Sequence, residues 1–324
     1  MPRVALLVLA SALAFLLSEN GFAQSYPTRP IRLVVGQAPG GHSDVIGRIV
    51  GQKIAEILKQ PVVIENRGGA GGTIGAEMVA RAPNDGYTLL LGGASNLAIA
   101  VALGGEVRYD PARDFVPIGG AAIVPYALAV SPSVPATTVS ELVAYARAHP
   151  GRLTYGSSGV GSTSSLAVEW LKSAAGIDIV HVPYRGLAPA VVALLSGEID
   201  LVVADLSLLT SHAKAGTLRL LASAGAQRAS AAPGLPTVAE QGIPGFAIEA
   251  WSGIVAPAGT PPEVVAKLSS GLSQALLAPE VRQRFEEFGY EPIVDTPAQF
   301  GALIRSDIER YTTLIKRAGI RVDP

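Results

Sequence analysis

The segment IRLVVGQAPGGHSDVIGRIVGQKIAEIL, residues 31–58, contains the pattern that determines the fold. It begins with the β-branched run Ile31 to Val35, which predicts a buried strand. A glycine-rich stretch, Gly36 to Asp44, leads into Val45 to Leu58, which has the spacing of an amphipathic helix. The apolar face of that helix consists of Ile46, Ile49, Val50, Ile54, Ile57 and Leu58. A strand, a glycine loop and a helix in this order are typical of parallel α/β proteins.

The same alternation continues along the chain. Further strands are predicted at Val62 to Glu65, Thr88 to Leu91, Ile179 to Val182, Leu201 to Ala204 and Leu218 to Ala222. Helix starts are marked by capping boxes, Thr138 with Glu141 and Thr296 with Gln299, and by Pro261 after Thr260. We therefore expect an α/β protein whose sheets are mostly parallel and flanked by helices.

The length of 324 residues leaves room for about two domains. Two proline-marked stretches, Pro117 to Pro135 and Pro233 to Pro257, are the expected crossings between them. The helices after Pro261 and Thr296 are expected to pack back onto the first domain. The sequence shows no internal repeat.

The N-terminus has the features of a cleavable secretory signal over residues 1–23. Arg3 precedes the apolar run Val4 to Leu17, and the small residues of Gly21-Phe22-Ala23 come before Gln24. A transmembrane helix is the alternative, but this run is shorter than the roughly 20 residues that a bilayer requires. The absence of cysteine excludes disulfides, thiolate metal sites and lipid attachment at an N-terminal cysteine. We therefore expect an exported protein.

Composition narrows the partners. The formal net charge is −1 and charged residues make up 16% of the chain, so nucleic acid is not an expected partner. The four histidines, His42, His149, His181 and His212, lie far apart and lack carboxylates at ligand spacing, so we expect no zinc or iron site. We expect no cofactor either.

Three loops have the composition of an anion-binding surface, because unpaired N–H groups at a helix N-terminus attract negative charge. They are Gly36 to Asp44, Ala94-Ser95-Asn96, and Tyr155 to Thr163. Taken alone, each is more often an ordinary connector than a ligand contact, and two such loops on opposing lobes favour the ligand. Asp44 and Arg48 have the spacing of a simple helical ion pair, and Asp205 could either cap a helix or face a ligand.

Sharper enzyme motifs are incomplete. Gly36 to Ser43 nearly matches a phosphate-binding loop, but His42 replaces the lysine. Gly156-Ser157-Ser158-Gly159 does not have the spacing of a nucleophile elbow, and Ile74 occupies a required glycine position of a dinucleotide fingerprint. An exported serine hydrolase using Ser157 or Ser158 remains the alternative from another class, although no supporting base is evident.

A series of motifs in one order is more specific than any single loop. It consists of Tyr26-Pro27, Pro30-Ile31-Arg32, Ala38-Pro39-Gly40-Gly41 with Asp44 and Arg48, Glu65-Asn66-Arg67-Gly68, Ala70-Gly71-Gly72, Ile74-Gly75, Asp85-Gly86-Tyr87-Thr88, Tyr109-Asp110-Pro111 with Asp114-Phe115, Tyr155-Gly156-Ser157 with Gly159, His181-Val182-Pro183-Tyr184 with Gly186, and Leu235-Pro236-Thr237-Val238. With these motifs, nearly all of the mature chain resembles the periplasmic solute-binding proteins of tripartite tricarboxylate transporters, the Bug family.

The resemblance implies a two-lobed, Venus flytrap architecture that closes on a small organic acid. Lobe 1 would comprise residues 24–125 plus 245–324, and lobe 2 residues 126–244. Loop amides, hydroxyls and ordered waters would hold the carboxylate. The implied ligand-binding residues are Gly40, Gly41, His42, Ser43, Asp44, Ser95, Asn96, Gly156, Ser157, Ser158, Gly159, Ser162, Thr163, Tyr184 and Asp205.

The resemblance also implies a periplasmic, non-catalytic monomer that delivers its ligand to membrane transporter subunits. Presentation of the ligand to a sensor kinase is an alternative output. This chain departs from the family at Gly36 and Gln37, where members usually carry proline and an aromatic residue. The expected pocket wall is therefore smaller and more polar, and the identity of the carboxylate is left open.

Overall fold

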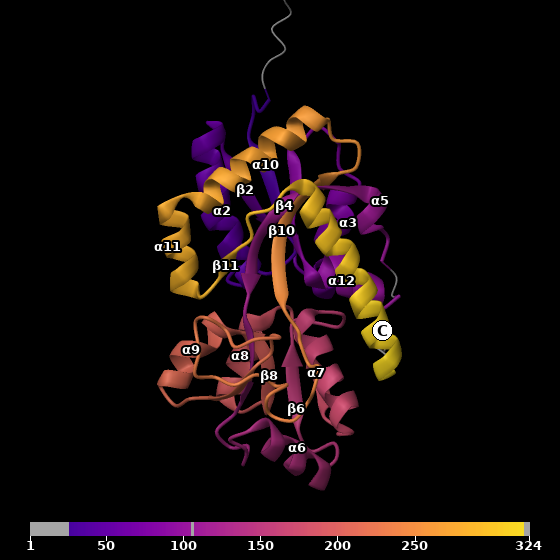
Figure 1. Ribbon diagram of the computed structural model, residues 1–324, viewed down its shortest axis with the longest axis vertical. Helices are drawn as coiled ribbons and strands as arrows, with labels where there is room; N and C mark the ends of the chain where they lie inside the picture. Colours follow the sequence, from indigo (N-terminus) through magenta and orange to yellow (C-terminus); the bar gives the residue numbers. More distant parts are fainter. Residues whose placement is uncertain (1–25, 105–106, 321–324) are drawn as a thin grey trace, which may run out of the picture.

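The computed structural model describes residues 26–104 and 107–320, and it consists of two lobes arranged along the long axis of the molecule (Figure 1). The expected signal sequence, residues 1–23, lies outside the described residues. Each lobe contains one sheet with helices packed against it. The expected α/β, two-lobed architecture is confirmed.

Lobe 1, the upper lobe in Figure 1, is built on a sheet with the strand order β11-β4-β10-β3-β1-β2. Its strands are β1 (Ile31–Val35), β2 (Val62–Asn66), β3 (Thr88–Gly93), β4 (Phe115–Val124), β10 (Ala250–Pro257) and β11 (Glu291–Pro292). Its helices are α2 (His42–Leu58), α3 (Thr73–Ala80), α4 (Ala100–Ala102), α5 (Pro111–Asp114), α10 (Pro262–Leu277), α11 (Pro279–Phe288) and α12 (Pro297–Ala318), with the short turns η1 (Ala70–Gly72) and η2 (Ser95–Ile99). As expected, the long helices α10 and α12 pack on this lobe.

Lobe 2 has the strand order β7-β6-β8-β5-β9. Its strands are β5 (Tyr126–Val130), β6 (Thr154–Ser157), β7 (Val180–Pro183), β8 (Leu201–Asp205) and β9 (Arg219–Ser223). Its helices are α6 (Val139–Ala148), α7 (Thr163–Ala175), α8 (Leu187–Ser196) and α9 (Leu206–Lys214). The chain passes between the lobes at Pro125 and again just before Ala250, which pairs with Val124. Both passages lie inside the proline-marked stretches expected to cross.

The expectation that the sheets are mostly parallel is wrong in detail, because both sheets are mixed. β1 pairs parallel with β2 and β3, and β6 pairs parallel with β7 and β8. β10 and β5, in contrast, run antiparallel to both of their neighbours. Each of these two strands enters its sheet from the other lobe, so it starts at the edge where the parallel strands end. That edge is the boundary between the lobes.

Local sequence signals explain the element boundaries. Thr296 and Gln299 form the full capping box of α12. Thr138 accepts the Glu141 N–H at the start of α6, but the Glu141 carboxylate accepts from the N–H of Thr137 instead of Thr138. Only half of that predicted capping box is therefore formed.

Helix α2 packs closely on the sheet because its inner face contains two glycines. A Cβ at Gly47 would lie 3.2 Å from a Val35 methyl, and one at Gly51 would lie 3.0 Å from Ile64. Ile46 and Val50 on the same helix are fully buried. Burial of each such side chain contributes about 1.5–3 kcal/mol, and this packing fixes the position of the first turn of α2 at the boundary between the lobes.

Candidate functional site

The ends of parallel strands and the starts of three helices meet where the two lobes face each other. β1 and β3 of lobe 1 end here, at Val35 and Gly93, and β6 of lobe 2 ends at Ser157. The first residues of α2, α7 and α8, which are His42, Thr163 and Leu187, line the two cavities in this region.

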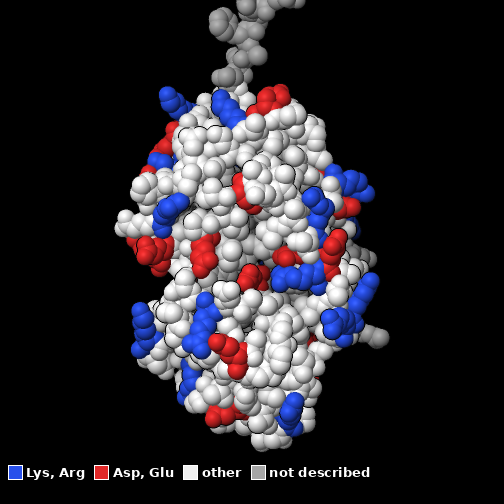
Figure 2. Space-filling view, viewed as in Figure 1, with Lys and Arg blue, Asp and Glu red and all other residues white. Residues whose placement is uncertain are grey.

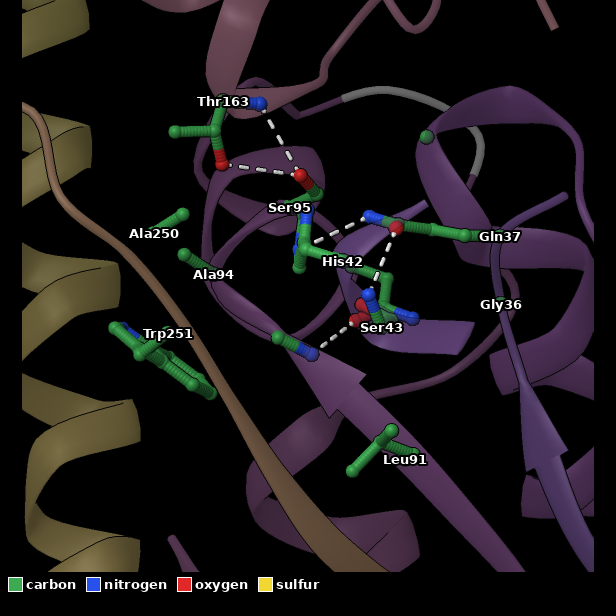
Figure 3. A pocket seen from close by; sticks show the side chains of 13 residues that line it. Gly36, Gln37, His42, Ser43, Leu91, Ala94, Ser95, Thr163, Ala250 and Trp251 are labelled. Carbon is green, nitrogen blue, oxygen red and sulfur yellow. Dashed lines mark hydrogen bonds between the residues drawn. The ribbon is translucent and has the colours of Figure 1, made fainter. Parts of the chain in front are cut away.

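The first cavity lies between the end of β3, the start of α2 and the start of α7 (Figure 3). The space open to the centre of a water molecule is only about 10 Å³, which is close to the minimum for one water. It is lined by Gly36, Gln37, His42, Ser43, Gly71, Leu91, Gly93, Ala94, Ser95, Asn96, Thr163, Ala250 and Trp251.

The second cavity adjoins the first and shares Gln37 and His42 with it. The space in it that is open to the centre of a water molecule is about 20 Å³. The lining is Gln37, Ala38, Pro39, Gly41, His42, Ser158, Gly186, Leu187, Ala188 and Pro189. Lysine, arginine, aspartate and glutamate are absent from both linings, so main-chain amides, hydroxyls, amides of side chains and one imidazole supply the polar surface.

Direct hydrogen bonds hold the lobes together at the first cavity. The Ser95 hydroxyl lies 3.0 Å from the Thr163 hydroxyl, and the Thr163 N–H donates to the same Ser95 oxygen at 3.1 Å (Figure 3). Beside them, a Cβ at Gly71 of lobe 1 would lie 3.4 Å from the Val160 carbonyl oxygen of lobe 2. The lobes are therefore closed on each other, and an anion larger than a water molecule requires them to separate.

Three helix N-termini create a positive potential at these cavities. α2, α7 and α8 contain 17, 13 and 10 residues, and each begins at a cavity wall. The first N–H groups of a helix have no partner within the helix, and the helix dipole adds about half a positive charge at that end. Such a site can stabilise an anion without a cationic side chain.

His42 is the only ionisable residue in the two linings. It is 5% exposed, and burial lowers its pKa from 6.5 to about 4. Gln37 contacts its Nε2 atom at 3.3 Å (Figure 3), and the Tyr126 ring lies edge-on at 6.0 Å. The next residue, Ser43, places its hydroxyl 3.4 Å from that of Ser252. His42 is therefore a neutral polar group at the centre of the site.

Seven of the fifteen residues expected from the sequence lie in these linings. His42, Ser43, Ser95, Asn96 and Thr163 line the first cavity. Gly41, Ser158 and again His42 line the second. The other eight lie outside both linings: Gly40, Asp44, Gly156, Ser157, Gly159, Ser162, Tyr184 and Asp205.

The buried Asp44 carboxylate holds the loop before α2. It forms an ion pair with Arg48 at 2.9 Å and accepts hydrogen bonds from the Gly40 N–H and the Asn66 side chain. These contacts, the Arg48 hydrogen bond first, hold its pKa below the usual value against the opposing effect of burial. In this closed arrangement Asp44 makes the helical ion pair that the sequence offered as an alternative.

Asp205 is the N-cap of α9 and also bridges the lobes. It accepts from the Ser207 N–H at 3.0 Å and from the Tyr290 hydroxyl of lobe 1 at 3.0 Å. Burial raises its pKa from 3.8 to about 6. Asp205 therefore caps α9, which is one of the two roles that the sequence offered for it.

The loop between β6 and α7 is organised mainly by internal contacts. Ser162 caps α7 and donates to the Gly159 carbonyl, and a Cβ at Gly156 would collide with Ile199. Tyr184 donates from its N–H to the Ser157 carbonyl and from its hydroxyl to Glu198. These residues set the position of Ser158 and Thr163.

At the start of this loop, Ser157 contacts His181, a pairing that the sequence did not reveal. The Ser157 hydroxyl is 2.6 Å from His181 Nε2, and the ring of Tyr155 stacks on His181 at 4.5 Å. Ser157 is fully buried and lines neither cavity. A nucleophile must reach its substrate, so this pair does not form an accessible hydrolase centre.

Sequence reasoning missed several lining residues. Gln37 was noted as a departure from the family but not as a contact, although it lines both cavities. Ala250 and Trp251 reach the site because β10 pairs with β3, with Ser252 opposite Gly93. No local motif marks them. The start of α8 carried a signal, since Gly186 precedes an apolar helix as the other loop glycines do.

A family model described as "Tripartite tricarboxylate transporter family receptor" matches residues 46–320. The chain belongs to this family. The receptor is 34% identical to Protein BugT of Bordetella pertussis over 301 residues, which cover 93% of this chain and 92% of BugT. The resemblance inferred from the motifs is confirmed.

Two solved structures of relatives contain carboxylates. The receptor is 36% identical to Rpa4515 of R. palustris with adipate, with a TM-score of 0.87 and coverage of 91% of this chain and 99% of that one. It is 33% identical to MatC (Rpa3494) of Rhodopseudomonas palustris with bound malate, with a TM-score of 0.85 and coverage of 90% and 100%. The family is one of periplasmic solute-binding receptors.

Two further findings concern the surroundings of the receptor. Within residues 26–104 and 107–320, no helix combines the length and apolar character needed to cross a bilayer, and no group of three metal-ligating side chains gathers. Figure 2 shows acidic and basic side chains interspersed over the face in view. That face therefore carries no broad field of one sign.

Proposed function

We propose that this receptor captures a small organic anion through a carboxylate group between its lobes. The observation that carries the proposal is the meeting of three helix N-termini at cavities whose walls contain hydroxyls and amides but no charged side chain. Oriented N–H groups bind an anion, whereas the lack of a lysine or arginine leaves no strong phosphate contact. The adipate and malate bound by relatives support a dicarboxylate.

Binding in this proposal requires opening and reclosure. The carboxylate enters between separated lobes and takes over the hydrogen bonds that Ser95 and Thr163 make to each other. Its contacts with both lobes then shift the population toward the closed form. His42, Ser43, Asn96, Gly41 and Ser158 complete the contacts. The remaining eight expected residues hold the loops in place.

The receptor is proposed to act in the periplasm after loss of residues 1–23, and to pass its ligand to a tripartite tricarboxylate-type membrane transporter. It would do so as a monomer and without catalysis. The proposed division is lobe 1 at residues 24–125 plus 245–324 and lobe 2 at 126–244, since β4 ends at Val124 and β5 begins at Tyr126.

Calorimetry with succinate, malate and adipate tests the proposal, with adipamide as the uncharged control. We expect saturable binding of at least one dicarboxylate and none of the diamide. Binding of the dicarboxylate also raises the free energy of unfolding, by about 2.7 kcal/mol at a ligand concentration of 100 times Kd. Failure of every carboxylate to bind would refute the proposal.

A matched pair of variants tests the location. Thr163→Val removes a hydroxyl at the cavity, whereas Thr313→Val makes the same change on the exposed face of α12. A hydrogen bond to a charged group contributes about 1.5–3 kcal/mol, so the first variant is expected to weaken binding about 10- to 100-fold. Equal affinities of the two variants would place the ligand elsewhere.

A further inference from the structure

Gln37 and His42 line both cavities, and their side chains contact each other. The side-chain amide of Gln37 lies beside the first turn of α2 and contacts both the His42 ring and the Ser43 main-chain N–H (Figure 3). This arrangement determines which ring nitrogen of His42 carries a proton.

The amide of Gln37 has only one chemically consistent orientation. The Ser43 N–H donates to Gln37 Oε1 at 3.4 Å, so the opposite orientation would set two N–H donors against each other. Gln37 Nε2 then faces His42 Nε2 at 3.3 Å. An amide NH₂ can only donate, and His42 Nε2 must therefore accept. The proton of a neutral His42 is left on Nδ1.

The surroundings of His42 favour the same state. Tyr126 of β5 packs edge-on against the ring. Asp205 is the carboxylate whose charge acts most strongly on Tyr126, but its hydrogen bonds go to Ser207 and Tyr290 and not to His42. Asp44, two residues along α2, is engaged with Arg48. Among the described residues no carboxylate forms an ion pair or hydrogen bond with His42 that would stabilise an imidazolium.

We infer that Gln37 fixes His42 as the neutral tautomer with its proton on Nδ1, and that this N–H is a specificity-determining donor to the ligand carboxylate. The inference about the ligand rests on the proposed function, whereas the tautomer does not. His42 contacts the ligand, and Gln37 is a positioning residue that acts through His42. The site thereby requires an acceptor at this point and excludes a ligand group that presents its own proton there.

Nitrogen-15 NMR of the ligand-free, full-length mature protein tests the tautomer. The four histidines of the chain give few signals, and those of His42 are assigned by their loss in His42→Asn. At neutral pH we expect a protonated Nδ1 and an unprotonated Nε2. Gln37→Glu replaces the NH₂ by an oxygen that can only accept, so it is expected to move the proton to Nε2 or to charge the ring. Gln274→Glu, on the exposed surface of α10, is the matched control and leaves the His42 signals unchanged.

Binding of adipate, or of whichever tested dicarboxylate binds best, tests the donor. An asparagine amide nitrogen lies about where Nδ1 lies, and leucine has a similar shape without a donor. We expect His42→Asn to retain affinity within a few-fold and His42→Leu to lose about 10- to 100-fold. Equal affinities of the two variants would overturn the role of the donor.

The outcomes separate the two proposals. If no carboxylate binds the wild-type protein, the proposed function fails, while the ligand-free NMR spectrum still decides the tautomer. If a carboxylate binds but His42 carries its proton on Nε2 or is charged at neutral pH, the inference fails and the proposed function stands.

Discussion

The two buried ionisable groups at the boundary between the lobes are expected to give opposite pH dependences of stability. Burial lowers the pKa of His42 from 6.5 to about 4, and burial raises the pKa of Asp205 from 3.8 to about 6. Folding therefore releases a proton from His42 and takes one up at Asp205 over nearly the same range. The variants His42→Asn and Asp205→Asn remove these two contributions one at a time.

The sign follows from proton linkage. The unfolded state binds more protons at His42, so the contribution of His42 to stability is full above pH 6.5 and is lost as the pH falls toward 4. The folded state binds more protons at Asp205, so its contribution is full below pH 3.8 and is lost as the pH rises toward 6. At about 1.4 kcal/mol for each pH unit, each contribution amounts to about 3 kcal/mol, and in the wild-type protein they largely cancel.

Urea unfolding at several pH values between 4 and 7 gives the free energy of unfolding of each variant. Its difference from the wild-type value isolates the contribution of the replaced residue, because the contributions of the other groups cancel. Asp205→Asn is expected to gain about 3 kcal/mol relative to wild type as the pH rises across this range, and His42→Asn to lose about as much. The double variant should follow the wild-type profile. Single variants whose free energies of unfolding run parallel to wild type at every pH would refute the reasoning.

Two further changes test the closed arrangement and the core. Ser95→Ala removes the acceptor of the Thr163 N–H and one hydroxyl contact, so it is expected to shift the ligand-free protein toward the open form by about 1–3 kcal/mol. Spin labels on cysteines introduced at the exposed residues 52 and 148 measure the lobe separation, and an unchanged distance distribution would contradict this. Gly253→Ala places a methyl group on the ring of Phe300 and is expected to destabilise the protein by about 1–3 kcal/mol. Thermal unfolding measures this cost, and a variant as stable as wild type would show that Phe300 repacks freely.

The sequence predicted those parts of the fold that local signals determine. Ile31 to Val35 is a strand with the predicted bounds, and Thr296 is the N-cap of the final helix with the predicted capping box. β4, β5 and β10 were not predicted as strands, because most of their residues lie in the proline-marked stretches that were expected only to cross between the lobes. The direction of β5 and β10 also depends on where the chain re-enters each sheet. That choice is made by contacts such as Ala250 with Val124, which no window of sequence contains.

The residues of the candidate site also fall into those that local sequence predicts and those that depend on how distant strands pair. The loops that begin α2 and α7 were recognisable, because glycine and hydroxyl residues before an apolar helix indicate an exposed N-terminus. Trp251 was not, since it reaches the cavity through the pairing of β10 with β3. Asp44 shows the limit of spacing arguments, since the same four-residue interval fits a ligand contact or the Arg48 ion pair that the structure contains.

The uncharged cavity walls also bear on how such receptors diversify. In the proposed site, attraction for the anion comes from peptide groups at the starts of α2, α7 and α8, and a point mutation exchanges a side chain without removing these groups. Replacements at positions such as Gln37 can therefore alter the shape and hydrogen-bonding preference of the chamber while the general affinity for acids persists. Related receptors can thus change their ligand specificity through single substitutions and still bind an anion at each step.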